Sequence, residues 1–120
     1  MPFTIIDGDD VGNKVESHLL SNNVSGFTES SKMITDFIDA LADALSSVST
    51  AKVVSVGGDS ILVEIDQSAI GELVEVLNSL QRPGVFTFSA GVGPTLRESF
   101  IALRMAKSTG KQKVVLYPDE

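Results

Sequence analysis

The sequence predicts an α+β domain whose antiparallel sheet is covered on one face by helices. Short segments rich in β-branched residues alternate with segments whose apolar residues recur every three or four positions. In chain order these segments give β-α-α-β-β-α-β-α-β. The two adjacent strands in the middle are joined by Gly57-Gly58-Asp59-Ser60, and two glycines with an aspartate between β-branched runs predict a hairpin.

The N-terminal part of the sequence predicts one strand and two helices. Residues 3–6 form a short apolar run that predicts a buried strand, which ends at the acidic sequence Asp7-Gly8-Asp9-Asp10. Residues 11–20 predict a short helix, which Ser21-Asn22-Asn23 ends. The clearest helix follows, because its apolar residues keep a helical spacing over residues 33–45.

The middle of the sequence predicts the hairpin and a third helix. Residues 52–56 and 61–65 are the two β-branched runs that form the strands of the hairpin. Residues 70–80 carry an apolar stripe at helical spacing. We expect Asp66 or Ser68 to cap the N-terminus of this helix, because both residue types accept hydrogen bonds from free backbone N–H groups.

The C-terminal part predicts a fourth strand, a fourth helix and a last strand. We expect residues 85–90 to form the fourth strand and Gly91, Gly93 and Pro94 to end it. The buried side of the next helix is expected to consist of Leu96, Phe100 and Leu103. Residues 114–117 predict a short terminal strand.

The central order β-α-β-β-α-β is that of the ferredoxin-like split unit, in which helices cover one face of an antiparallel sheet. The extra helices and the C-terminal strand lie outside this unit. The sequence contains no internal repeat, low-complexity tract or interdomain linker. We therefore expect residues 1–120 to form one domain.

Charge is distributed unevenly along the chain. The net charge is −7, yet residues 1–81 hold 13 acidic and 3 basic residues, whereas residues 82–117 hold 6 basic residues and 1 acidic residue. A net acidic chain argues against binding to a DNA or RNA polymer, which requires an excess of base. The absence of cysteine excludes disulfides and thiolate metal sites. The apolar runs are far shorter than the roughly 20 residues that span a bilayer, so we expect a cytoplasmic protein that does not contact membranes.

Two carboxylates are predicted to meet at one edge of the sheet. In a β-α-β-β-α-β sheet the first strand lies beside the hairpin, so Asp7 comes near Asp59. Carboxylate oxygens are the ligands that Mg²⁺ or Mn²⁺ prefers, and the backbone carbonyl of Gly8 is a third candidate ligand. Gly57 and Gly58 would allow a triphosphate to lie against the turn without a Cβ clash.

The residues alone also allow a simpler interpretation of these motifs. Asp-Gly and Gly-Gly-Asp sequences are ordinary turn chemistry. Against this, Asp7, Asp9 and Asp10 form a dense acidic cluster, whose mutual repulsion is costly unless the cluster is solvated or neutralised by a cation. The backbone N–H groups of residues 10–13, at the start of a helix, could also receive a phosphate. Both interpretations stay open on this evidence.

Four motifs in a fixed order resemble those of the palm-type nucleotide cyclases. They are Asp7-Gly8-Asp9-Asp10-Val11-Gly12, Gly57-Gly58-Asp59-Ser60, Ser89-Ala90-Gly91-Val92-Gly93 and residues 102–111. The palm cyclases include the GGDEF diguanylate cyclases and the polymerase-like palm of type III CRISPR complexes. In length and layout the chain is similar to the minimal CRISPR polymerase (mCpol) family.

The resemblance implies roles for individual residues. Asp7, the Gly8 carbonyl and Asp59 would hold the metal, and Lys107 and Lys111 would hold the triphosphate. The remaining residues that we expect at the nucleotide are Asp9, Asp10, Val11, Gly12, Gly57, Gly58, Ser60, Ser89 and Arg104.

The sequence departs from the family pattern at two positions. Ser60 stands where the palm families have a second acid. The Asn-Asp pair with which GGDEF proteins bind guanine is missing, since Asn13 is followed by Lys14, and this favours adenine by elimination.

The resemblance implies a nucleotidyltransferase that converts ATP into a cyclic di- or oligonucleotide with two Mg²⁺ or Mn²⁺ ions. Joining two nucleotides requires a second palm that faces the first, so we expect a homodimer. In this family the product would be an antiphage signal that a downstream effector reads. Two alternatives are a degenerate palm that binds a nucleotide without turnover, which Ser60 suggests, and a ring-opening enzyme like GTP cyclohydrolase III.

Overall fold

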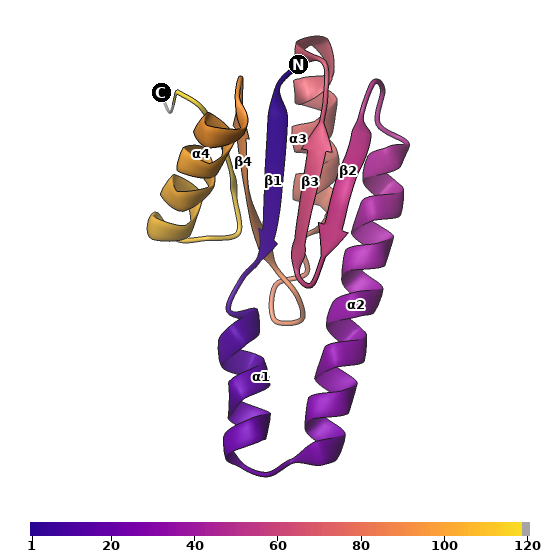
Figure 1. The fold of residues 1–120 in the computed structure, drawn as a ribbon, viewed down its shortest axis with the longest axis vertical. Helices are drawn as coiled ribbons and strands as arrows, with labels where there is room; N and C mark the ends of the chain where they lie inside the picture. Colours follow the sequence, from indigo (N-terminus) through magenta and orange to yellow (C-terminus); the bar gives the residue numbers. More distant parts are fainter. Residues whose placement is uncertain (119–120) are drawn as a thin grey trace.

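The computed structural model describes residues 1–118 as a five-stranded sheet with four α-helices (Figure 1). The strands are β1 (Phe3–Gly8), β2 (Lys52–Gly57), β3 (Ser60–Glu64), β4 (Phe88–Gly93) and β5 (Val114–Leu116). The helices are α1 (Val11–Leu20), α2 (Val24–Ser46), α3 (Ile70–Leu80) and α4 (Leu96–Ser108), with a short 3₁₀ helix, η1 (Gln67–Ala69), before α3. The predicted α+β class and order of elements are confirmed.

β1 is the central strand of the sheet, whose order is β2-β3-β1-β4-β5. It pairs antiparallel with β3 and with β4, so that Asp7 lies opposite Ser60 on one side and opposite Ser89 on the other. This is the strand order of the predicted split unit. β5 is the exception to the antiparallel pattern, because it pairs parallel with β4 and makes the sheet mixed.

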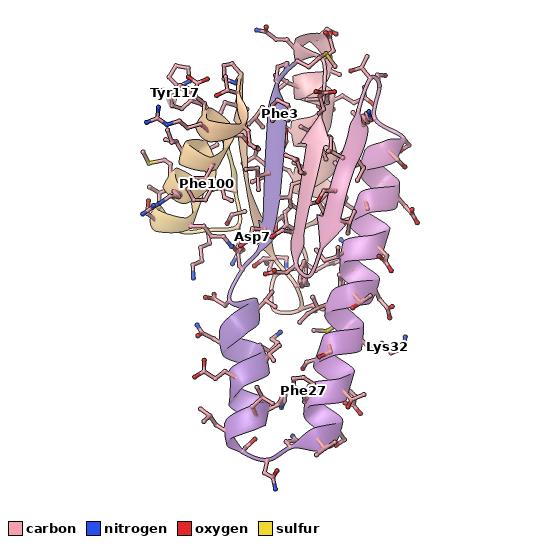
Figure 2. The ribbon with its side chains drawn as sticks, viewed as in Figure 1. Phe3, Asp7, Phe27, Lys32, Phe100 and Tyr117 are labelled. Atoms are coloured by element: carbon pink, nitrogen blue, oxygen red, sulfur yellow. The ribbon has the colours of Figure 1, made fainter. Side chains whose placement is uncertain are left out.

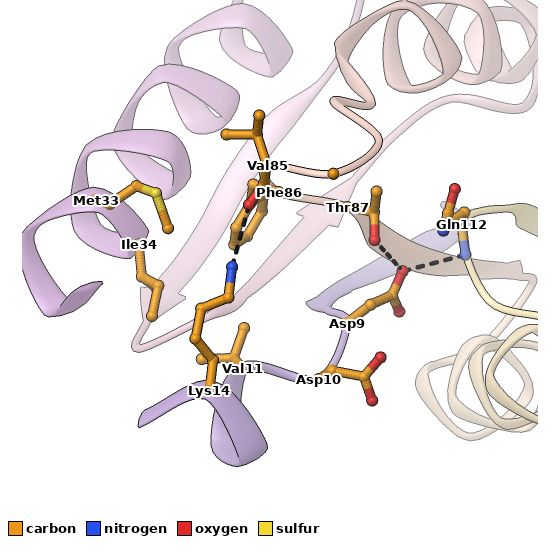
Figure 3. Close-up of a pocket in the computed structure, with 11 residues that line it drawn as sticks. Asp9, Asp10, Val11, Lys14, Met33, Ile34, Val85, Phe86, Thr87 and Gln112 are labelled. Carbon is orange, nitrogen blue, oxygen red and sulfur yellow. Dashed lines mark hydrogen bonds between the residues drawn. The ribbon is translucent and has the colours of Figure 1, made fainter. Parts of the chain in front are cut away.

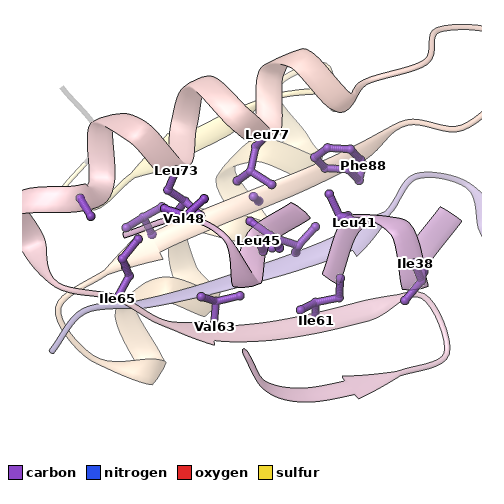
Figure 4. Close-up of a cluster of buried hydrophobic side chains, with 14 of the residues drawn as sticks. Ile38, Leu41, Leu45, Val48, Ile61, Val63, Ile65, Leu73, Leu77 and Phe88 are labelled. Carbon is purple, nitrogen blue, oxygen red and sulfur yellow. The ribbon is translucent and has the colours of Figure 1, made fainter. Parts of the chain in front are cut away.

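The main hydrophobic core lies between the sheet and the helices α2 and α3. Leu41 and Leu45 of α2 and Leu73 and Leu77 of α3 are buried together against the sheet (Figure 4). The sheet contributes alternate residues to this core, which include Ile6, Ile61, Val63, Ala90 and Val92. Their side chains point to one face, as the period of two in a strand requires.

Helix α4 lies on the opposite face of the sheet, so the expectation that helices cover only one face holds for α2 and α3 and is wrong for α4. The reason lies in two glycines of β4, which alternate with the core residues Ala90 and Val92. A Cβ atom on Gly91 would come within 2.2 Å of the Leu103 backbone nitrogen, and one on Gly93 within 2.5 Å of the Ser99 nitrogen. The two glycines therefore allow α4 to pack on the strand. Gly91 lies inside the strand, whereas Gly93 is its last residue, so the expected end of the strand is confirmed at Gly93 and Pro94 and is wrong for Gly91.

Apart from Leu103, which is buried as expected, small residues form the buried side of α4. Its buried residues are Ser99, Ala102, Leu103 and Ala106. Leu96 and Phe100 are 50% and 48% exposed, so their expected burial is wrong. Small side chains allow the helix to pack this closely on glycine, and the Ser99 hydroxyl donates to the Gly91 carbonyl at 2.7 Å.

The fourth strand begins later than the sequence pattern indicates. Residues 82–86 form a tight turn, in which Arg82 and Phe86 exchange backbone hydrogen bonds of 3.0 and 2.9 Å. Gly84 has a φ of +83° within this turn. Residues 85–87 therefore belong to this turn and to the connection that follows it, and β4 begins only at Phe88. At its other end, Pro94 follows the last residue of the strand.

Helices α1 and α2 form a hairpin that projects beyond the sheet (Figures 1 and 2). α2 begins at Val24, about two turns before the expected start, and the Asn23 side chain accepts a hydrogen bond of 2.9 Å from the Gly26 N–H. The hairpin makes the molecule elongated, at 47 × 28 × 22 Å. Within residues 1–118, no helix is long and apolar enough to cross a membrane.

We predict that Gly91→Ala destabilises the domain. The added methyl group would overlap the backbone of α4, and overpacking of this kind costs about 1–3 kcal/mol of unfolding free energy. Urea denaturation followed by circular dichroism measures the change. Gly71→Ala in α3 is the matched control, because a Cβ there meets no atom within 4 Å and we expect equal or higher stability. Equal stability of the two variants would contradict the packing role of Gly91.

Candidate active site

The predicted carboxylates Asp7 and Asp59 meet at the end of β1, beside the β2–β3 turn. Asp7 and Ser60 are cross-strand partners, and the Ser60 hydroxyl donates to Asp7 Oδ1 at 2.5 Å. The Gly8 N–H donates to the Asp59 carbonyl at 2.9 Å, which fixes the turn to the end of the strand. The sheet register thus brings together two acids that are far apart in the sequence.

The electrostatic environment of Asp59 favours a nearby cation. Burial raises the pKa of the Asp59 carboxyl, and the negative charge of Asp7 raises it further, although Lys107 acts in the opposite direction. A like charge disfavours ionisation, so a cation between the two acids would stabilise both. Within residues 1–118 no group of three or more Asp, Glu, His or Cys side chains is arranged to hold a metal. Two carboxylates and a backbone carbonyl are nevertheless a set that suits Mg²⁺, which usually keeps several waters.

Asp9, which the sequence predicts at the nucleotide, has a side chain that points inward. Its side chain is only 3% exposed. The carboxylate accepts hydrogen bonds from Thr87 Oγ1 at 3.0 Å and the Gln112 N–H at 3.1 Å (Figure 3). It also accepts one from Ser89 Oγ at 2.7 Å. Burial by itself raises the pKa of Asp9, but the hydrogen bonds from Lys107 and Ser89 outweigh it and lower the pKa overall.

Lys107 reaches the site from the last turn of α4. Its Nζ donates to the Gly8 carbonyl at 2.8 Å and to Asp9 Oδ1 at 2.9 Å. It also lies 3.2 Å from both the Asp7 carbonyl and Asp7 Oδ2. The lysine that we expected to bind the triphosphate therefore contacts the carboxylates in this structure. All four contacts of its Nζ are with residues of β1 or with Asp9, which follows β1.

Lys111 lies on the outer side of the same region. Its Nζ forms an ion pair of 2.6 Å with Asp10 Oδ1, and this hydrogen bond raises the pKa of Lys111. Lys111 and Gln112 have φ values of +61° and +51°, so the loop after α4 reverses direction and brings the Gln112 N–H to Asp9. Both predicted lysines are thus near the acidic loop.

The other predicted residues divide into those at the site and those outside it. A Cβ on Gly57 or Gly58 meets no atom within 4 Å, so the turn leaves free space for a ligand. Ser89 is buried and donates a hydrogen bond to Asp9, so it holds the Asp9 carboxylate in place. Arg104 lies over the Phe100 ring, at 5.9 Å from its centroid, on the half-exposed side of α4.

A cavity of about 240 Å³ opens beside Asp9 and Asp10 (Figure 3). Its walls come from α1, α2, the turn before β4 and the loop before β5. The residues that the sequence did not identify there are Lys14, Met33, Ile34, Gly84, Val85, Phe86 and Gln112. Lys14 Nζ donates to the Val85 carbonyl across this cavity at 3.4 Å. Val11, in the first turn of α1, also lines the cavity, whereas Gly12 is not among its walls.

The sequence of the chain matches the model of a known protein family. The model of the minimal CRISPR polymerase domain (mCpol) matches residues 3–117. Comparison with curated proteins gave no significant match.

Solved structures with the same fold include a GGDEF domain, the GGEEF domain of a diguanylate cyclase and the Csm1–Csm4 cassette. The GGDEF domain of DgcB from Caulobacter crescentus, solved with c-di-GMP, has a TM-score of 0.73 and 13% identity over 96% of this chain and 76% of that chain. The GGEEF domain of a diguanylate cyclase from Vibrio cholerae has a TM-score of 0.67 and 17% identity, over 100% and 85%. A chain of the Csm1–Csm4 cassette, solved with pppApA, has a TM-score of 0.64 and 21% identity, over 94% of this chain and 20% of that chain.

We predict that Asp9→Asn lowers the free energy of unfolding by about 1–3 kcal/mol, because the substitution removes a charged acceptor from buried donors. Thermal and urea denaturation measure the loss. Asp36→Asn is the control, since Asp36 forms only an exposed ion pair with Lys32, and we expect a change below about 0.5 kcal/mol. Equal losses of unfolding free energy in the two variants would show that the hydrogen bonds of Asp9 contribute nothing to stability.

The stability that Asp9 contributes should depend on pH. Its pKa in the folded state lies below the ordinary value of 3.8, so the contribution is present above about pH 4 and is lost as the pH falls through the folded pKa. Between pH 7 and pH 3, Asp9→Asn should therefore lose less stability than the unaltered protein does. Parallel losses in the two proteins would contradict this assignment.

Proposed function

This chain belongs to the minimal CRISPR polymerase (mCpol) family of palm-fold nucleotide cyclases and polymerases, and from that premise we propose that it converts ATP into a cyclic di- or oligonucleotide. The observation that carries the proposal is the meeting of Asp7, the Gly8 carbonyl and Asp59 within reach of Lys107. This arrangement suits the transfer of a nucleotidyl group. The acids can bind a metal ion, and the lysine adds a second positive charge that offsets the charge of the phosphates.

Asp7 and Asp59 would hold Mg²⁺ or Mn²⁺, with the Gly8 carbonyl as a further ligand. When bound, such an ion lowers the pKa of a hydroxyl and offsets the negative charge on phosphate oxygens, and we propose that two ions serve here. The Ser60 hydroxyl orients one oxygen of Asp7, which leaves Oδ2 on the side of Lys107. The raised pKa of Asp59 supports the assignment, because a cation would relieve the repulsion that causes part of the shift.

Lys107 and Lys111 would bind the triphosphate as point charges. The open space at Gly57 and Gly58 allows phosphates to approach the turn, and the cavity beside Asp10 has room for the nucleoside. We propose adenine as the base, because the chain lacks the Asn-Asp pair of GGDEF proteins and because the Csm1–Csm4 cassette of similar fold was solved with pppApA.

We also propose that the protein acts as a homodimer and serves antiphage signalling. A single palm has one pair of carboxylates, so a second palm facing the first would supply the other nucleotide. A cyclic product would act through a downstream effector, as the relation to CRISPR polymerases suggests.

A second candidate function is nucleotide binding without turnover. Ser60 favours it, because this position carries a hydroxyl and not a second acid. In this case Asp7 and Asp59 would hold a metal–nucleotide complex, and the protein would act as a receptor.

We predict that incubation with ATP and Mn²⁺ or Mg²⁺ releases pyrophosphate and a cyclic adenine nucleotide, which mass spectrometry of a reaction with all four nucleoside triphosphates identifies. Asp59→Ala should lower kcat on the order of a hundredfold, because the metal contributes several kcal/mol to the transition state. Asp39→Ala, on the exposed side of α2, is the charge-matched control and should retain full activity. Full turnover by Asp59→Ala would refute the two-carboxylate assignment, and tight ATP binding without a product would establish the second candidate.

A further inference from the structure

Lys107 Nζ lies among oxygen atoms that a metal ion would also use. The Gly8 carbonyl accepts from it at 2.8 Å, and Asp7 Oδ2 lies 3.2 Å away. Both atoms belong to the set that the proposed function assigns to the cation. The ammonium group is therefore in place as a positive charge at the end of β1.

The position of Lys107 is imposed by the fold. The preceding residue, Ala106, is fully buried where α4 packs against β5. Asp9 Oδ1 accepts from Nζ at 2.9 Å, and this carboxylate is itself held by Ser89 and the Gln112 N–H. With its side chain only 26% exposed, Lys107 is fixed at both its backbone and its charged end.

We propose that Lys107 is a resident counter-cation that competes with the metal for Asp7 and the Gly8 carbonyl. This inference rests on the proposed function. One ammonium group and one divalent ion cannot share the same lone pairs at contact distance, because like charges at 3–4 Å repel strongly. Metal binding therefore displaces Lys107 from these two acceptors, and the released ammonium becomes available to the triphosphate. Through this exchange, binding of the metal ion favours binding of the triphosphate, and the reverse also holds.

The chain offers a matched comparison in Lys111. Lys111 carries the same charge and pairs with a neighbouring acid, Asp10, at 2.6 Å. Its Nζ is bonded to Asp10, whereas Lys107 Nζ contacts Asp7 and Gly8 directly. Replacing either lysine removes one positive charge near the site, but only Lys107 vacates metal-binding oxygens.

The test is Mn²⁺ binding to the nucleotide-free protein, measured by electron paramagnetic resonance of the free ion. We expect Lys107→Met to bind Mn²⁺ at least about fivefold more tightly than Lys111→Met does, in the range typical of coupled sites. Asp59→Asn, introduced alone and together with Lys107→Met, should weaken binding in both backgrounds. Equal Mn²⁺ affinity in the two lysine variants would overturn the inference.

A second measurement uses the unaltered protein, because Lys107→Met leaves Asp9 without its charged partner and could impair folding. Nuclear magnetic resonance of ¹⁵N-labelled lysine side chains detects the hydrogen-bonded ammonium group of Lys107 directly. Titration with Mg²⁺ alone should shift this signal and leave that of Lys111 in place. Saturation of the site by Mg²⁺ without a shift would overturn the inference, whereas Mn²⁺ binding that ignores Asp59→Asn would overturn the metal assignment of the proposed function instead.

Discussion

The buried carboxylate of Asp9 is the interaction on which the geometry of the site depends. It binds donors from the start of β4, from the end of α4 and from the loop before β5, so one side chain joins three segments to the end of β1. A carboxylate in this position is costly to bury, and only the surrounding donors keep it charged. The same contacts fix Lys107, and through it the Gly8 carbonyl and Asp7. The end of the sheet that carries the candidate site is thus held in place by buried hydrogen bonds behind it.

The packing of α4 shows where sequence patterns succeed and where they fail. The spacing of apolar residues along the sequence predicted the helix itself, because this spacing depends on local backbone structure. It identified Leu103 on the buried side but wrongly placed Leu96 and Phe100 there, since the contact with β4 depends on how closely the two backbones approach, and Gly91 and Gly93 determine this distance. Gly91 was interpreted as part of the end of the strand, although the strand continues to Gly93. A glycine that permits a turn and one that permits close packing look alike in a single sequence.

The candidate site was predictable to the extent that sheet topology determines it. The order of the strands alone places Asp7 beside the turn at Asp59, and the structure has that arrangement. The inward direction of Asp9 was not predictable, because its donors at Ser89, Lys107 and Gln112 come from distant parts of the chain. The cavity was missed for a similar reason: its walls arise from the α1–α2 hairpin and the turn before β4, which approach each other only in the folded chain.

The central place of β1 has a consequence for biosynthesis. The strand is translated before both of its partners, because Asp7 pairs with Ser60 and Ser89, which leave the ribosome several seconds after it at ordinary rates of elongation. Both edges of this apolar strand therefore stay unpaired while most of the chain is made, and their pairing must close long loops. The α1–α2 hairpin, whose contacts are local, can form during that interval.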